Sequence, residues 1–509
     1  MINARFVTRV RAVALVCVLV ALVLICKLYY LQVIHGAEYV RRADAQQIEL
    51  KNPLLNRGTI YFSARDGTLI TAATLREVAS SSQTEHQRYY PGGALAAQTL
   101  GFVAYNNDNE QKGRYGLERY YEQTLARGGS ESYSNFFVEL FGGFAGAFSG
   151  SGGGQGDIVT TIEPSVEAEL ERVLAGYVGS WRPALAGGII MDPKTGEIVA
   201  MATMPSFDLN VFNLEQGTEI FKNPHVESVY EMGSIIKPLT LAAGLDSGAI
   251  TEASTYDDKG CITLDQKKIC NFDMTARGVL PMQEILSQSL NMGSAFVATT
   301  MGPQTFREYF INRYKLGEES GIDLPGEVRG LVSNLQSPRQ VEYATAAFGQ
   351  GIAITPIETI RALASLGNGG LLVTPHLVRA VKYDTGVVRE LSWEQGTQVL
   401  KTETSVAISR MLTKVVDEKL ANGALKMEHY SIAAKTGTAQ IANPSGGGYY
   451  EDRFLHSFFG YAPSYDPKFV IFLFAVEPKG APYSSQTWAT PFGEIVKFLI
   501  HYYSIPPDR

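Results

Sequence analysis

Strand-like segments lie at both ends of a long helical region, and this order limits the possible folds more than any other feature of the sequence. Residues 234–430 follow a largely helical pattern of apolar positions. The strand-like segments before and after it are residues 158–162, 188–191, 197–202, 432–441, 458–461 and 469–476. The order predicts an α+β domain in which both ends contribute to one antiparallel sheet flanked by helices.

An almost uncharged segment near the N-terminus is long enough to cross a bilayer. Residues 12–34 follow Arg5, Arg9 and Arg11 and extend roughly 35 Å as a helix. No small-x-small cleavage site ends the segment, which favours a transmembrane helix over a cleaved signal peptide. The positive-inside rule then predicts that residues 1–11 form a cytoplasmic tail. We therefore expect a single-pass protein of the cytoplasmic (inner) membrane whose remaining chain is extracytoplasmic.

Two regions separate the predicted membrane helix from the main domain. Residues 35–127 contain strand and turn signals and are predicted to form a small, mostly β domain. Residues 128–156 are rich in glycine, serine and phenylalanine. Their glycine and serine content indicates a flexible linker, whereas the phenylalanines suggest contact with an apolar surface. The large α+β domain is expected to occupy residues 157–509.

Charge and cysteine usage restrict the chemistry. Lys+Arg number 44 and Asp+Glu 51, for a net charge of −7, so a nucleic-acid partner is not expected. Cys261 and Cys270 flank a short predicted hairpin. They are able to pair in an oxidising compartment, and two free thiols are the alternative. No second Cys/His pair lies near them in the sequence, so no metal site is expected.

A serine and a lysine three residues apart are the first candidates for catalysis. Ser234 and Lys237 would lie on one face of a helix, where the amine can take the proton of the hydroxyl and create a nucleophile. Taken alone, the pattern is more often a solvated helix face. Gly233 before the serine permits a tight turn into the helix, and the apolar run after Lys237 indicates burial. This context favours acyl transfer.

Two further polar motifs accompany this pair. Ser289 and Asn291 lie between two helical patterns, where a helix cap is the alternative explanation. Residues 435–438, Lys-Thr-Gly-Thr, continue a strand pattern, and a lysine that protects an edge strand is the alternative there. Gly437 would allow close approach of a substrate or another backbone. The three motifs in this order indicate one active site.

These motifs resemble those of serine β-lactamases and penicillin-binding proteins, S-x-x-K, S-D-N and K-T-G. Over almost its whole length the sequence is similar to class B penicillin-binding proteins, the bacterial monofunctional peptidoglycan transpeptidases. The other matching landmarks are residues 28–34, 57–60, 66–67, 90–91, 116–118, 192–210, 348–351, 355–356 and 458–460. The resemblance implies a penicillin-binding transpeptidase domain that follows a membrane helix and a pedestal domain.

The resemblance also implies a role for each motif residue. Ser234 would attack a terminal D-Ala-D-Ala peptide, with Lys237 as general base. Ser289 would relay a proton toward the leaving D-alanine, and Asn291 would hold Lys237 and the substrate amide. Lys435 would bind the substrate carboxylate.

The Lys-Thr-Gly-Thr motif would also hold the substrate. Thr436 and Thr438 would bind the carboxylate with Lys435, beside Gly437. The backbone N–H groups of Ser234 and Thr438 would form the oxyanion hole. The substrates would be peptidoglycan stem peptides, the inhibitors β-lactams, and the partner a multi-pass membrane glycosyltransferase; no cofactor is implied.

The sequence departs from the family pattern in two places. Met232 replaces the usual proline before the glycine of the serine motif, for which we expect little effect. The pedestal is shortened, because only residues 68–87 stand where the family commonly has a large subdomain. The alternatives to transpeptidation are a β-lactamase or D,D-carboxypeptidase, in which water deacylates the enzyme, and a structural subunit that activates a cell-wall glycosyltransferase.

Overall fold

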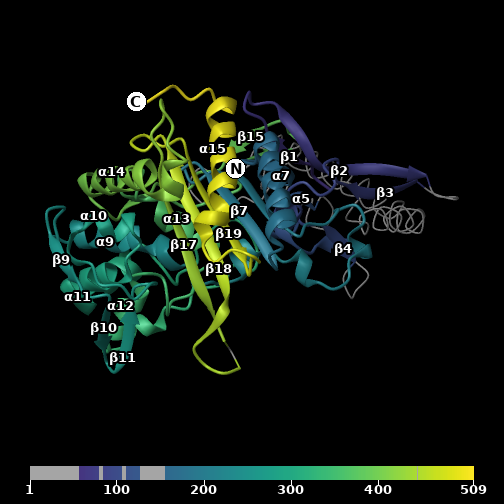
Figure 1. Cartoon of the computed structure of the whole chain (residues 1–509). Coiled ribbons are helices and arrows are strands. Elements are labelled where there is room, and N and C mark those ends of the chain that lie inside the picture. The colour runs from purple at the N-terminus through teal and green to yellow at the C-terminus, as the bar shows by residue number, and fades with distance from the viewer. Residues whose placement is uncertain (1–56, 80–83, 106–110, 127–154, 384, 444) are drawn as a thin grey trace, which may run out of the picture. The chain divides into compact units, whose positions relative to one another are not determined.

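The computed structural model describes residues 57–79, 84–105, 111–126, 155–383, 385–443 and 445–509 (Figure 1). The predicted cytoplasmic tail, transmembrane helix and most of the predicted linker lie outside these residues. Within the described ranges, no helix combines the length and apolar character needed to cross a membrane. Residues 58–126 and 153–509 belong to one compact unit.

A five-stranded antiparallel sheet is the centre of this unit. Its strands, in spatial order, are β17 (Ala433–Ala442), β18 (Tyr449–Ala462), β19 (Phe469–Val476), β7 (Leu185–Met191) and β8 (Ile198–Met204). The predicted sheet formed from both ends of the domain is thus confirmed. β19 reads Phe-Val-Ile-Phe-Leu-Phe-Ala-Val and is buried on both faces, as expected for a central strand that is covered on each side.

Helices cover the sheet. α7 (Pro164–Trp181) and α15 (Ser484–Tyr502) pack together against it, and the rings of Tyr177 and Trp488 stack with their centroids 3.7 Å apart. The other main helices lie together to the left of α15 in Figure 1. They include α9 (Lys237–Asp246), α10 (Gln283–Ser287), α11 (Asn291–Arg307), α12 (Gln340–Ala346) and α14 (Thr402–Glu418).

A second sheet joins the N-terminal region to the main domain. Its order is β15 (Val388–Glu390), β14 (Val378–Tyr383), β6 (Gly156–Thr160), β1 (Ile60–Ser63), β2 (Leu69–Ala79) and β3 (Thr84–Tyr89). β1 pairs in parallel with β6. The prediction that residues 158–162 belong to the antiparallel sheet is therefore wrong, because the apolar pattern of so short a strand does not encode which strand it pairs with.

The region 234–430 is less helical than its pattern predicts. Its short antiparallel ribbons include β9 (Thr255–Asp258) with β12 (Gly278–Pro281), and β10 (Cys261–Leu264) with β11 (Lys267–Cys270). The second ribbon is the hairpin predicted between the two cysteines. Each ribbon is a separate two-stranded sheet. Its strands therefore lack the long alternation of apolar and polar residues by which a strand of a large sheet is recognised in a sequence.

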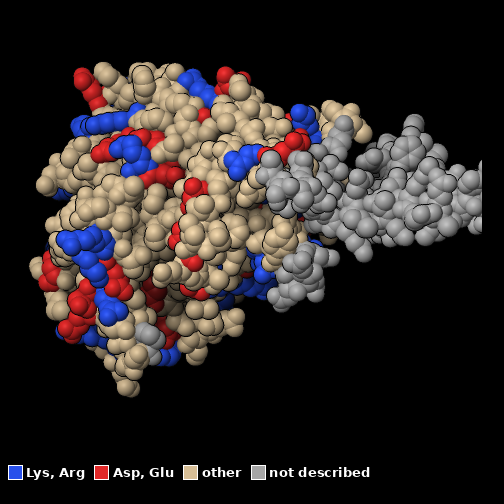
Figure 2. Space-filling view, turned by 90° about the vertical axis from the view of Figure 1, so that its right-hand side faces the viewer, with Lys and Arg blue, Asp and Glu red and all other residues tan. Residues whose placement is uncertain are grey.

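Charged side chains of both signs are scattered over the face of the molecule in Figure 2. On the described part of the face in Figure 2, Lys and Arg side chains are interspersed with Asp and Glu, without a stripe of one sign.

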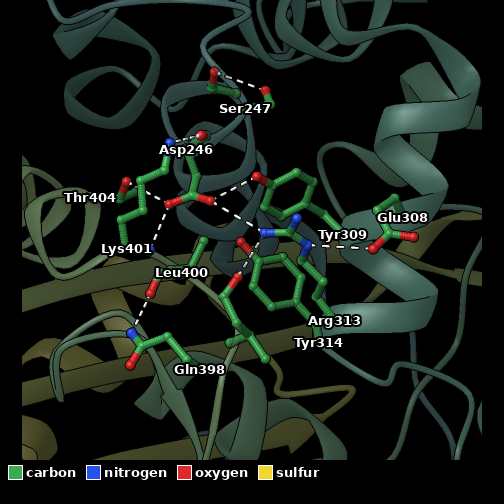
Figure 3. Close-up of polar contacts among 12 residues, drawn as sticks. Asp246, Ser247, Glu308, Tyr309, Arg313, Tyr314, Gln398, Leu400, Lys401 and Thr404 are labelled. Atoms are coloured by element: carbon green, nitrogen blue, oxygen red, sulfur yellow. Dashed lines mark hydrogen bonds and ion pairs between the residues drawn. The ribbon is translucent and has the colours of Figure 1, made fainter.

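Asp246 anchors the C-terminal end of α9, the helix that begins at the catalytic candidate Lys237 (Figure 3). Its Oδ1 accepts hydrogen bonds from the Lys401 amide (2.7 Å) and the Thr404 hydroxyl (2.8 Å). Its Oδ2 accepts from the Tyr309 hydroxyl (2.7 Å) and from Arg313 (3.4 Å). The carboxylate is buried, so these donors replace the water it would otherwise bind.

Replacing Asp246 with alanine is expected to lower the free energy of unfolding by about 3 kcal/mol, because several donors would lose their acceptor inside the protein. Urea unfolding followed by circular dichroism measures this. The matched control is Glu308→Ala, which removes an exposed partner of Arg313 and should cost less than about 1 kcal/mol. Equal losses in the two variants would contradict the anchoring role of Asp246.

Candidate active site

Ser234 lies in a tight turn that leads into α9. The 3-10 turn η4 (Gly233–Ile236) continues directly into that helix. Gly233 adopts φ +67°, a conformation that favours glycine, and its N–H donates to the Gly349 carbonyl (3.1 Å). The carbonyl of Met232 accepts a hydrogen bond from the Ser457 hydroxyl (2.8 Å). Contacts with two separate segments, at Gly349 and at Ser457, thus fix the turn that carries Ser234.

Gly437 explains how the Lys-Thr-Gly-Thr strand, β17, comes so close to this turn. A Cβ atom at Gly437 would lie 2.3 Å from Ser457 Oγ and 2.7 Å from the Met232 carbonyl oxygen. Similarly, a Cβ at Gly349 would lie 2.3 Å from the Gly233 oxygen. The close approach predicted for Gly437 is therefore to the backbone of the serine turn.

The variant Gly437→Ala is expected to lose about 1–3 kcal/mol of stability and to acylate more slowly, since the methyl group would displace the serine turn. Thermal unfolding and the rate of penicillin labelling measure the two effects. Gly176→Ala in α7 is the matched control, because a Cβ there meets nothing within 4 Å and alanine favours the helix. Unchanged labelling in Gly437→Ala would show that the close contact is not required.

Two buried lysines meet at one hydroxyl. Lys237 Nζ donates to the carbonyl oxygen of Ser289 (2.5 Å) and to its Oγ (3.3 Å). Lys435 Nζ donates to the same Oγ (3.1 Å) and to the Thr436 carbonyl (3.0 Å). Ser289 has φ +56°, which is uncommon outside glycine and is held here by its surroundings. The structure therefore brings together four of the residues that the sequence motifs singled out.

Burial determines the ionisation of both amines. It lowers the pKa of Lys237 well below its usual value, and the nearby Lys435 cation lowers it further. Burial also lowers the pKa of Lys435, to about 7. Two ammonium groups beside one hydroxyl repel each other, so a protonated Lys435 favours the neutral form of Lys237. A neutral amine of this kind is suited to act as a general base.

Asn291 begins α11, but its contact differs from the one expected. Its Nδ2 donates to the carbonyl oxygen of Cys270 (2.9 Å), and among the described residues Lys237 has no hydrogen bond to it. Cys270 is joined to Cys261 by a disulfide across the β10–β11 hairpin. The next amide, Met292 N–H, donates to the Asn271 side chain (3.1 Å). The cysteine hairpin thus supports the start of α11.

A cleft with a volume of about 720 Å³ runs along these motifs. Its lining includes Ser234, Ser289, Asn291, Thr436 and Thr438. Ser234 is a partly exposed residue, and its Oγ has no hydrogen-bond partner among the described residues. The Thr438 hydroxyl accepts a hydrogen bond from the Ser484 N–H at the start of α15 (3.1 Å).

Sequence reasoning missed the apolar wall of the cleft. The lining also includes Phe272, Met274, Phe348, Phe454 and Tyr483. Phe272 and Tyr483 make an edge contact with ring centroids 6.0 Å apart, although they lie more than two hundred positions apart in the chain. These residues come from separate loops and strands, so no local sequence pattern predicts that they line the same cleft.

The chemistry that this arrangement supports is transfer of an acyl group. A serine hydroxyl faces a cleft, a buried amine is available as base, and a second amine and two threonine hydroxyls can bind an anion. Within the described ranges, no group of three or more His, Cys, Asp or Glu side chains is arranged to hold a metal ion.

Comparison with known proteins agrees with this chemistry. The family model described as the penicillin binding protein transpeptidase domain matches residues 186–497. Stage V sporulation protein D of Bacillus subtilis is 30% identical over 83% of this chain, and the match spans 65% of that relative. Peptidoglycan D,D-transpeptidase FtsI of Buchnera aphidicola is 26% identical over 83% of this chain and 71% of its own length.

A solved structure is similar over most of the chain. The crystal structure of penicillin binding protein 3 from Mycobacterium tuberculosis in complex with ampicillin is 25% identical in sequence. The match has a TM-score of 0.76 and covers 89% of this chain and 96% of the other.

Proposed function

The chain belongs to the family of penicillin-binding protein transpeptidases, and from this premise we propose that it is a penicillin-sensitive peptidoglycan D,D-transpeptidase that cross-links stem peptides through an acyl-enzyme on Ser234. The observation that carries the proposal is the position of Ser234 in a cleft, one turn from a buried lysine whose pKa is strongly lowered.

In the acylation step, Lys237 takes the proton of Ser234 as Oγ attacks the carbonyl of the penultimate D-alanine. The backbone N–H groups of Ser234 and Thr438 receive the developing oxyanion, and such a donor is typically worth about 3–4 kcal/mol of barrier. The C–N bond then breaks, and the leaving amine needs a proton. Ser289 is suited to relay it, because its hydroxyl contacts both lysine amines.

Substrate binding relies on the other side of the cleft. The terminal carboxylate is bound by Lys435, Thr436 and Thr438. Its negative charge stabilises the protonated form of Lys435, whose pKa is lowered by burial. Asn291 lines the cleft with its amide nitrogen held by Cys270, and we assign it a contact with the substrate peptide rather than with Lys237.

Release of the acyl group requires an amine. The amino group of a neighbouring stem peptide attacks the ester, forms the cross-link and regenerates Ser234. We also propose a single-pass membrane location, supported by the uncharged segment at residues 12–34, and a membrane glycosyltransferase as the partner that supplies glycan strands.

A thioester analogue of a D-Ala-D-Ala donor, offered with and without an amine acceptor, tests the proposed reaction. We expect the amine adduct to exceed the hydrolysis product when the acceptor is present, and mass spectrometry measures both. Hydrolysis alone, at a rate that the acceptor does not change, would identify a carboxypeptidase instead. No turnover and no labelling of Ser234 would support a structural subunit.

A further inference from the structure

A carboxylate that lacks a counterion lies beside the serine turn. Glu231 precedes Ser234 by three residues. Its Oε1 accepts hydrogen bonds from the Gly351 N–H (3.1 Å) and from the Tyr449 hydroxyl (3.1 Å). Its Oε2 is buried and has no hydrogen-bond partner among the described residues. None of the described cations forms an ion pair with it.

This carboxylate lies close to residues of the cleft, since Glu231 is two positions before Gly233, which lines it. Gln350, which lines the cleft, is next to Gly351, a donor to Glu231. Gln440, another lining residue, donates to the carbonyl of Tyr450, which follows Tyr449, the other donor. The described residues that line the cleft include no Asp or Glu, and Glu231 is an acidic group held by residues next to that lining.

A partly buried carboxylate without a counterion has an unfavourable solvation free energy, which is reflected in its pKa. Burial raises the pKa of Glu231, while the Tyr449 and Gly351 hydrogen bonds lower it. A buried polar atom without a partner is uncommon in folded proteins and calls for an explanation. A cationic ligand that completes the site would supply the missing partner.

We propose that Glu231 recognises the ammonium group of a diamino acid in the stem peptide, and so sets the preference of the enzyme for substrates that carry a free amine. The proposal rests on the proposed transpeptidase function. Tyr449, which donates to the carboxylate, is 37% exposed at the start of β18, directly after Gly447 and Gly448, whose φ values are +68° and +74°. Rotation of this tyrosine would break its hydrogen bond to Oε1 and leave that oxygen available to a ligand.

The same ammonium chemistry can come from the donor stem or from the acceptor stem, and two assays separate them. The donor assay compares kcat/KM for thioester peptides whose diamino side chain is free or N-acetylated. The acceptor assay keeps an acetylated donor and compares a free diamino acid with its monoacetylated form as acceptor. We expect the wild type to prefer the free amine by about tenfold or more in one assay, and Glu231→Gln to remove that preference.

Glu342→Gln is the matched control. Glu342 lies near Tyr449, but its carboxylate already pairs with Arg339 (3.1 Å), so the variant should keep the preference. If Glu231→Gln does not fold, Glu231→Asp is used instead. Aspartate keeps the negative charge, but its side chain is one methylene shorter, so the carboxylate lies farther from the ligand. A wild type without preference in either assay, or a preference that survives in the Glu231 variant, would overturn the proposal.

Labelling by benzylpenicillin on the same samples separates this proposal from the proposed function. A wild type that labels at Ser234 but ignores the side-chain amine refutes only the role of Glu231. A wild type that neither labels nor turns over the thioesters refutes the transpeptidase itself.

Discussion

Replacing Ser234 with alanine is expected to abolish covalent labelling by benzylpenicillin, whereas the wild type gains the mass of one penicilloyl group. The serine hydroxyl is the only group in the proposed reaction that forms the ester, so no slower route should remain. Intact-mass spectrometry after incubation measures the adduct, and peptide mapping locates it. The matched control is Ser485→Ala, another serine that lines the cleft, which should label normally.

Circular dichroism and thermal unfolding of Ser234→Ala show whether the fold is retained, which we expect because the side chain makes no hydrogen bond to the described residues. Equal labelling of Ser234→Ala and wild type would place the nucleophile elsewhere. An unlabelled wild type would refute the acyl-enzyme.

Replacing Lys237 with alanine is expected to slow acylation by about 10²–10⁴-fold while Ser234 stays in place, because the general base is lost. Stopped-flow or quenched mass spectrometry gives the acylation rate. Lys419→Ala, a lysine outside the cleft lining, is the control and should acylate at the wild-type rate. Normal acylation in Lys237→Ala would exclude this amine as the base.

The pH dependence of kcat/KM tests the same assignment in the wild type. At low pH Lys237 is protonated and cannot accept the serine proton, so the rate should rise with pH as this amine loses its proton. Above about 7, Lys435 also loses its proton and attracts the substrate carboxylate less strongly, so the rate should fall. Lys435→Arg should retain activity on the alkaline side, because arginine stays charged. A profile that rises steadily through pH 9 would contradict this role of Lys435.

The sequence predicted the parts of this molecule that depend on local order. Periodic apolar residues identified β7, β8, β18 and β19, and the three motifs identified Ser234, Lys237, Ser289 and Lys435 as neighbours. Each motif spans only a few residues, so its residue types and their spacing are enough to predict its chemistry.

Contacts between distant segments were not predictable in this way. The hydrogen bond from Asn291 to Cys270 depends on how α11 meets the cysteine hairpin. The pairing of Glu231 with Tyr449 joins residues more than two hundred positions apart. The left-handed backbone of Ser289 is imposed by its surroundings, because serine alone does not favour it.

The parallel pairing of β1 with β6 has a practical consequence for dividing the chain. A fragment that begins at residue 157, the predicted start of the transpeptidase domain, would lose β1, β2 and β3 together. One side of β6 would then present unpaired backbone N–H and C=O groups to solvent, and such an exposed edge invites association with other chains. Strands β1, β2 and β3 therefore also cover this edge of β6, and we expect a soluble fragment to behave better when it begins before β1.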